Sequence, residues 1–192
     1  MGGSRTIKTL GLLLLAMTAG TVVLAFLQTE PVRPGAQPLA VLAPPPAGAA
    51  GVIYETRVPI QRIKWRYLVV HAARSDADAT ARGCHFLIRT GPDGQWEIRP
   101  TGHWLVQGSG RHIGSLWADS SVGICLIGDF SRRCPAERQF DLLVELVHAL
   151  QDLCSIPADR VYLHSDLVAR STSPGAAFPA ERFTRHLLQA AR

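Results

Sequence analysis

Residues 121–127 read SVGICLI, and this stretch decides the fold class. Its side chains are almost all apolar, which is typical of a strand whose two faces are both covered by other segments. We therefore predict a strand at residues 121–127, placed centrally in a sheet. A central strand of this kind requires further strands at its edges and helices on its faces.

Four other segments of the chain have the composition of strands. The first is rich in β-branched and aromatic side chains, and the turn sequence GPDG at residues 91–94 separates two others and predicts a hairpin. The predicted strands are residues 65–71 (WRYLVVH), 84–89 (CHFLIR), 95–99 (QWEIR) and 160–164 (RVYLH).

Two segments have apolar residues at helical spacing. Within residues 135–153, apolar side chains fall on one face and charged ones on the other, and Pro135 suits the first turn of a helix. Residues 181–191 are predicted to form a closing helix. Together these elements predict an α/β (α+β) fold, a single domain with a central mixed β-sheet flanked by helices.

The first 30 residues have the features of an exported or membrane-anchored segment. An apolar block runs from Leu10 to Leu27, with Arg5 and Lys8 before it and no basic residue after it until Arg33. This asymmetry is typical of an export segment whose N-terminus stays in the cytoplasm. The block has about the 20 residues that span a bilayer core. We favour an uncleaved anchor in the cytoplasmic membrane over a cleaved signal peptide, which would leave a secreted protein.

Residues 31–51 are rich in Pro, Ala and Gly, so they are predicted to be a tether and not part of a core. The folded domain is then predicted to comprise residues 52–192, on the extracytoplasmic side of the membrane. The chain is moderately basic, with a net charge of +5, but its basic residues are scattered and form no nucleic-acid-binding motif. Nucleic acid is therefore not an expected partner.

The sequence has four cysteines, and an exported domain favours disulfides. Cys134 and Cys154 flank a predicted helix, whose rise of 1.5 Å per residue separates its ends by about 27 Å. A disulfide requires Cα atoms within about 7 Å, so these two cysteines cannot pair with each other.

The most informative polar residues are two histidines. His71 is the last residue of one predicted strand and His164 the last residue of another. A rigid sheet presents side chains at strand ends to a cleft, and two imidazoles placed in this way can form part of a zinc site, which needs three protein ligands. The alternative is that both histidines are ordinary capping or hydrogen-bonding residues.

Five segments occur in an order that resembles a known family: VVH at 69–71, GCHFLI at 83–88, SVGICLIGDF at 121–130, IPADRVYLHSDL at 156–167 and STSPGAAFP at 171–179. The series is similar to that of the zinc-dependent N-acetylmuramoyl-L-alanine amidases, which include phage-type endolysin amidases and the animal peptidoglycan recognition proteins. The resemblance extends from Trp65 to about Phe183. It implies a cleft for peptidoglycan or muropeptides that holds the lactyl-L-alanine amide and the stem peptide.

In this family, zinc is held by a His that ends the first strand, a His in a GHRD-like segment and a Cys or Asp shortly after it. The resemblance places these metal ligands at His71, His164 and Ser173. A serine hydroxyl is neutral at pH 7 and is a much poorer zinc ligand than a thiolate or a carboxylate. This departure weakens the expectation of a zinc cofactor.

Two positions that the family uses in catalysis are cysteines here. Cys84 stands where members often have a Tyr that stabilises the oxyanion, and Cys125 stands where some have a catalytic Glu. Three states of this pair stay open: a thiolate that replaces the third zinc ligand, a disulfide between adjacent strands, or two buried thiols. The resemblance also suggests substrate contacts by His112, with an ordinary loop histidine as the alternative, and by Arg170, near the position of an assisting Lys of the family. Trp117 is a candidate for packing against sugar rings, but a structural role is favoured for it.

Two functions from different classes follow from these residues. The first is an enzyme, a zinc amidase that cuts the lactyl-L-alanine amide with an unusual third ligand. The second is a module that binds wall fragments without zinc and without hydrolysis. A scaffolding role in the cell envelope is a third possibility.

Overall fold

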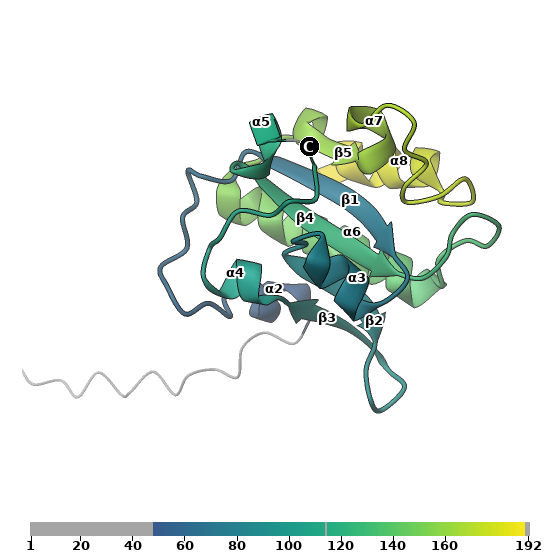
Figure 1. Ribbon diagram of the computed structural model, residues 1–192, viewed down its shortest axis with the longest axis horizontal. Coiled ribbons are helices and arrows are strands. Elements are labelled where there is room, and N and C mark those ends of the chain that lie inside the picture. The colour runs from purple at the N-terminus through teal and green to yellow at the C-terminus, as the bar shows by residue number, and fades with distance from the viewer. Residues whose placement is uncertain (1–47, 114, 191–192) are drawn as a thin grey trace, which may run out of the picture. The chain divides into compact units, whose positions relative to one another are not determined.

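The computed structural model describes residues 48–113 and 115–190 (Figure 1). These residues belong to one compact unit of the chain, Pro44–Arg192. The predicted anchor at residues 1–30 and most of the predicted tether lie outside the described residues. Within the described residues, no helix combines the length and the apolar character that a membrane crossing requires.

One five-stranded sheet with the order β3-β2-β4-β1-β5 forms the centre of this unit. Four strands are parallel to one another, and β3 returns antiparallel to β2 as the predicted hairpin. All five predicted strands are present, and the mixed sheet confirms the predicted fold class. The strands are β1 (Tyr67–Ala73), β2 (Phe86–Thr90), β3 (Trp96–Pro100), β4 (Ser121–Ile127) and β5 (Val161–Leu163).

The two predicted helices are also present, as α6 (Glu137–Cys154) and α8 (Ala180–Ala190). Shorter helical segments connect the other strands: α2 (Ala49–Val52), α3 (Asp76–Ala81), α4 (Gly102–Leu105), α5 (Ser115–Ala118), a 3-10 turn (Ala158–Arg160) and α7 (His164–Leu167). Ala49 and Ile53 are buried in the core. The packed domain therefore includes residues upstream of position 52, where the sequence placed its boundary.

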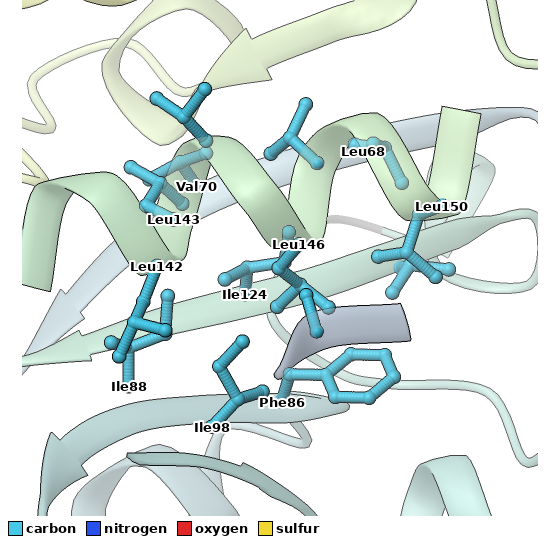
Figure 2. Close-up of a cluster of buried hydrophobic side chains, with 14 of the residues drawn as sticks. Leu68, Val70, Phe86, Ile88, Ile98, Ile124, Leu142, Leu143, Leu146 and Leu150 are labelled. Carbon is cyan, nitrogen blue, oxygen red and sulfur yellow. The ribbon is translucent and has the colours of Figure 1, made fainter. Parts of the chain in front are cut away.

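The two faces of the sheet have different covers. On one face, α6 lies across the strands and its leucines pack against apolar side chains of the sheet (Figure 2). On the other face, Leu87 and Cys125 form a smaller cluster with Ala79 of α3. Side chains alternate along a strand, and Val70 belongs to the cluster under α6. His71, the next residue, therefore points to the face that carries α3.

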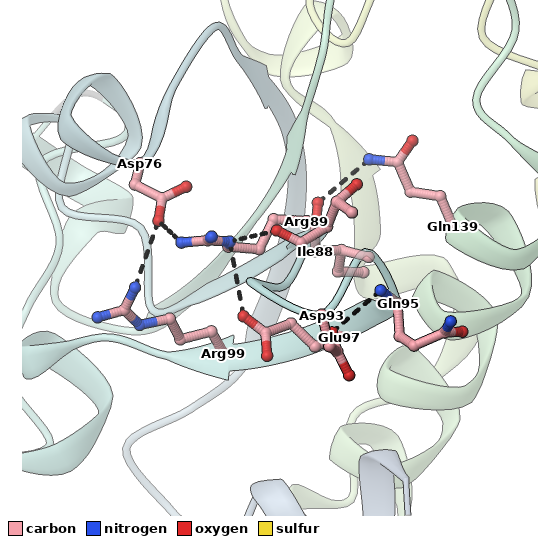
Figure 3. Close-up of polar contacts among 9 residues, drawn as sticks. Asp76, Ile88, Arg89, Asp93, Gln95, Glu97, Arg99 and Gln139 are labelled. Atoms are coloured by element: carbon pink, nitrogen blue, oxygen red, sulfur yellow. Dashed lines mark hydrogen bonds and ion pairs between the residues drawn. The ribbon is translucent and has the colours of Figure 1, made fainter.

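An ion-pair network connects α3 to the β2–β3 hairpin (Figure 3). The Asp76 carboxylate at the start of α3 pairs with Arg89 of β2 and with Arg99 of β3. These charges are partly exposed, so each pair adds little to stability, but together they fix where the short helix lies. Behind the sheet, Gln139 Nε2 of α6 donates to Ile88 O at 3.1 Å.

Candidate functional site

His71 is buried on the α3 face of the sheet, with 1% of its surface exposed. The predicted strand ended at this residue, but β1 continues because Ala72 and Ala73 pair with Leu126 and Ile127 of β4. The prediction that His71 is the last residue of its strand is therefore wrong by two positions. His71 still lies near the carboxyl end of β1, where the sheet opens to solvent.

His112 lies beside His71, in the loop between α4 and α5. Its Nδ1 is 3.1 Å from His71 Nε2. The His112 ring covers Gly123 of β4, where a Cβ atom would come within 2.7 Å of His112 Cδ2. Position 123 must therefore be glycine for the ring to lie on the strand. His112 is 5% exposed and contacts His71, and the substrate contact that the sequence suggests for it stays a prediction.

Hydrogen bonds around these rings assign their tautomers. The Ser121 hydroxyl donates to Trp117 O at 2.8 Å, so it can only accept from His112 Nε2, which is 3.5 Å away. His112 then carries its proton on Nε2, and its Nδ1 accepts from His71 Nε2–H. His71 Nδ1 keeps its lone pair, the form that can ligate a metal or accept a proton.

His164 follows β5, the neighbour of β1, and is the first residue of α7. Its ring centroid is 4.6 Å from that of His71, so the structure brings the two histidines together at adjacent strands, as expected. His164 Nδ1 is 2.6 Å from Ser171 Oγ. Sequence reasoning missed Ser171, which lies two residues before the predicted ligand Ser173 in the same STSPG segment.

The pKa values of the three histidines all lie below the ordinary value of 6.5. Burial is the largest cause in each case, because it disfavours the charged ring. It lowers the pKa of His112 to about 4 and the pKa of His71 well below its usual value, with His112 and His164 adding to the effect on His71. The pKa of His164 is lowered by burial and then by the charge of Arg82, against a hydrogen bond with the His112 backbone. All three rings are therefore neutral at pH 7.

His85 is a fourth buried histidine, 5.6 Å from His112 between ring centroids. Gly123 N–H donates to its Nδ1 at 3.0 Å, so the proton is on Nε2, which donates to Gly108 O at 2.9 Å. Burial lowers the pKa of His85 to about 3. Both ring nitrogens are used inside the fold, which gives His85 a structural role.

Ser173 presents a neutral hydroxyl, which is a poor zinc ligand. Its Oγ accepts a hydrogen bond from Ala72 N–H at 3.0 Å. The neighbouring Ser171 Oγ is hydrogen-bonded to His164 Nδ1. In the part of the chain that the structure describes, no three His, Cys, Asp or Glu side chains are grouped so that they could hold a metal ion. Two neutral imidazoles and a neutral hydroxyl do not fit a tightly bound zinc ion.

Cys84 and Cys125 form a disulfide that joins β4 to the segment between α3 and β2. Of the three states that the sequence left open, this is the one found. A disulfide sulfur is not a thiolate, so neither cysteine supplies the missing anionic ligand. Cys134 and Cys154, which helix length excluded from pairing with each other, are both free.

The other two residues predicted to contact substrate, Trp117 and Arg170, lie in different surroundings: Trp117 is packed and Arg170 is exposed. Trp117 packs edge-on against Tyr67, with ring centroids 4.5 Å apart, and its carbonyl accepts the Ser121 hydroxyl. These contacts support the structural role that the sequence analysis favours for Trp117. Arg170 is exposed, with a φ of 69°, directly before Ser171 in the loop that leads to Ser173.

A cavity of about 440 Å³ adjoins the histidines at the carboxyl ends of β1 and β4. The histidine rings do not line it, but Ala72 and Ser173, which neighbour His71 and His164, do. Its volume is in the range of small-molecule sites. Besides Ser173, its charged and polar lining consists of Arg74, Asp78, Arg82, Asp129, Ser131 and Thr172.

Comparisons with known proteins agree with this architecture. The family model of the N-acetylmuramoyl-L-alanine amidases matches residues 61–176. No curated protein sequence matches the chain. The N-acetylmuramoyl-L-alanine amidase LysC from Clostridium intestinale URNW has a similar structure, with a TM-score of 0.54 and 21% identity over 70% of this chain and 93% of that chain.

AmpDh3 from Pseudomonas aeruginosa, solved in complex with an anhydromuramic pentapeptide, is similar with a TM-score of 0.52 and 20% identity over 69% of this chain and 64% of that chain. At these identities, the likeness to solved structures shows the fold. The family match covers more than half of the 192 residues. The chain therefore belongs to the N-acetylmuramoyl-L-alanine amidase family.

Proposed function

We propose that this protein binds peptidoglycan fragments through their stem peptide and does not hydrolyse them. The observation that carries the proposal is the set of side chains at the positions that the family uses for chemistry. Ser173 is neutral and bonded to the Ala72 N–H where the family has an anionic zinc ligand. The Cys84–Cys125 disulfide stands where members often have a catalytic Tyr and some have a catalytic Glu. Metal activation of water and stabilisation of the oxyanion are both weakened by these residues.

The cavity beside the histidines supports binding of a stem peptide. Arg82 is engaged by Asp78, with Nε and Oδ1 2.9 Å apart. Arg74 has no ion pair within the described residues, so its guanidinium is available to a ligand carboxylate. Stem peptides carry such carboxylates, and the similar fold of AmpDh3 was solved with an anhydromuramic pentapeptide.

The test is calorimetric titration of the full chain with an anhydromuramyl tripeptide, in EDTA and in added zinc, with a parallel assay for released peptide. We expect equal affinity in both solutions and no release. Arg74→Ala should weaken binding about tenfold through loss of a charged hydrogen bond. Arg185→Ala, which changes an exposed arginine of α8 that does not line the cavity, is the matched control. Zinc-dependent release of the peptide would contradict the proposal.

A second candidate function is zinc-dependent cleavage of the lactyl-L-alanine amide. The observation that favours it is the contact between His71 and His164, two neutral imidazoles with ring centroids 4.6 Å apart at adjacent strands. This candidate predicts about one zinc per chain after loading, whereas the recognition proposal predicts none. Metal analysis of the purified protein separates the two candidates without an activity assay.

We also propose that the protein is exported and held in the cytoplasmic membrane by its N-terminal segment, with the domain outside. The support is the apolar block between Leu10 and Leu27, preceded by Arg5 and Lys8. N-terminal sequencing of the protein from its own cells tests this. A mature chain that begins after Leu27 would replace the anchor by a signal peptide.

A further inference from the structure

The exposed apolar side chains of the described residues are concentrated in one place. Four large apolar residues are exposed there: Tyr54 (57%), Val58 (37%), Ile63 (90%) and Val106 (51%). The segments that carry them are joined by hydrogen bonds. Arg57 N–H donates to Leu105 O at 2.7 Å, and Gln61 N–H donates to Gln107 Oε1 at 3.2 Å. Two stretches far apart in the sequence therefore lie side by side, and the exposed apolar residues come from these two stretches.

Basic residues are interspersed with these apolar residues along the chain. Residues 54–66 contain Arg57, Arg62, Lys64 and Arg66 but only one acidic residue, Glu55. Lys64 lies near Asp119 and donates to Gln107 O, so its charge is partly used within the fold. Arg57 and Arg62 are exposed, and no ion pair within residues 48–113 and 115–190 involves either of them.

We propose that this surface, the basic apolar patch of Tyr54, Arg57, Val58, Arg62, Ile63 and Val106, binds the anionic surface of a lipid bilayer. Arginines attract anionic headgroups, and apolar side chains such as the almost fully exposed Ile63 gain free energy when they enter the interface. The combination of both kinds on one irregular segment fits a headgroup layer better than it fits a dry protein interface, whose buried centre is depleted of charge.

In the order of the chain, this patch follows the proposed anchor and its tether. The apolar block ends at Leu27, and the described domain begins at Gly48, six positions before Tyr54. Within the domain, Trp104 Nε1 donates to Ile53 O at 3.1 Å. The first described residues of the domain therefore lie beside the segment that carries Val106. A tether that leads from a bilayer to this point delivers the patch to the bilayer at high effective concentration.

The patch and the cavity lie at opposite ends of β1. The patch precedes Tyr67, at the amino end of the strand, whereas the cavity is lined by Ala72 and Ala73 at its carboxyl end. Seven residues of strand separate these ends by about 20 Å. A domain bound to the bilayer through the patch therefore directs the cavity away from the lipid, toward the space that holds the wall. This inference is independent of whether the cavity binds muropeptides or the histidines bind zinc.

The experiment uses the full chain reconstituted in phosphatidylcholine vesicles with or without phosphatidylglycerol. Cys134, the exposed free cysteine, is changed to Ser, and a nitroxide label is attached at Ile63→Cys or, as a control, at Asp93→Cys in the exposed turn between β2 and β3. Collision with a water-soluble nickel complex should be about tenfold weaker at position 63 than at position 93 when phosphatidylglycerol is present. Arg57→Glu with Arg62→Glu should abolish this protection, and Arg132→Glu with Arg133→Glu, in the loop after β4, should leave it unchanged.

Three outcomes would overturn the proposal. The label at position 63 could remain as open to the nickel complex as the label at position 93. Its protection could increase with the ratio of protein to lipid and not depend on phosphatidylglycerol, which would indicate that a second copy of the chain covers the patch. Its protection could require isolated peptidoglycan instead of lipid. Flotation with phosphatidylcholine vesicles tests the anchor separately, and a chain that does not float can still be added to phosphatidylglycerol vesicles for the same measurement.

Discussion

His71 Nε2 lies 3.1 Å from His112 Nδ1, and both rings are buried. The two residues are 41 positions apart, and only the packing of the α4–α5 loop on β4 brings them together. Because His112 Nδ1 accepts a hydrogen bond from His71 Nε2–H, the orientation and tautomer of His71 depend on a residue outside every strand of the sheet.

Gly123→Ala should displace the His112 ring, since the new Cβ atom would lie 2.7 Å from His112 Cδ2. Overpacking of this kind lowers the free energy of unfolding by about 1–3 kcal/mol. Gly102→Ala in α4 is the matched control, because a Cβ atom there meets no atom within 4 Å. Urea unfolding of both variants checks the prediction, and equal stabilities would show that the ring tolerates a side chain at position 123.

The buried state of His85 should make stability depend on pH. Its pKa in the folded protein is about 3, against an ordinary value of 6.5 in the unfolded chain. Between these two pKa values, His85 is therefore protonated in the unfolded chain and neutral in the folded protein. The contribution of His85 is complete above pH 6.5 and is lost as the pH falls toward 3, in total about 5 kcal/mol at 1.36 kcal/mol per pH unit.

His85→Asn keeps an acceptor for the Gly123 N–H but has no ring to protonate. Urea unfolding between pH 7 and pH 4 should show a smaller loss of stability in this variant than in the wild type. Parallel curves for the two proteins would mean that His85 is not the group that titrates.

Ser173→Cys should increase zinc affinity about a hundredfold or more, because a thiolate adds the charge that a hydroxyl lacks. The substitution changes one atom next to His71 and His164, so its effect on packing should be small. Thr172→Cys, which lines the cavity at the adjacent position, is the control and should gain much less. Competition with a zinc-binding dye measures both affinities. Tight zinc binding by the wild type would show that Ser173 does not weaken zinc binding at this site.

Replacement of both Cys84 and Cys125 by Ala should destabilise the domain. Their disulfide closes a loop with a sequence separation of 41, for which the loss of chain entropy in the unfolded state is worth about 4 kcal/mol. Cys134→Ala removes an exposed free thiol and should leave the unfolding midpoint unchanged. If the double variant unfolds at the wild-type urea concentration, the disulfide does not form in the protein.

Much of the sheet could be predicted because its signals are local. The apolar run at residues 121–127 became β4, buried on both faces, and the GPDG turn became the connection of the β2–β3 hairpin. The end of β1 was not predictable, since Ala72 and Ala73 have weak strand preferences of their own. They belong to the strand because Leu126 and Ile127 of β4 pair with them.

The sequence by itself determined the family, the mixed sheet, and the meeting of His71 with His164, because strand patterns and ordered motifs are properties of consecutive residues. Only the tertiary structure decided that Cys84 pairs with Cys125, that His112 supports His71, and that Ser171 contacts His164. These contacts depend on which side chains two separate segments direct at the same point. Such directions are set by sheet register and loop packing, which no local pattern in the sequence records.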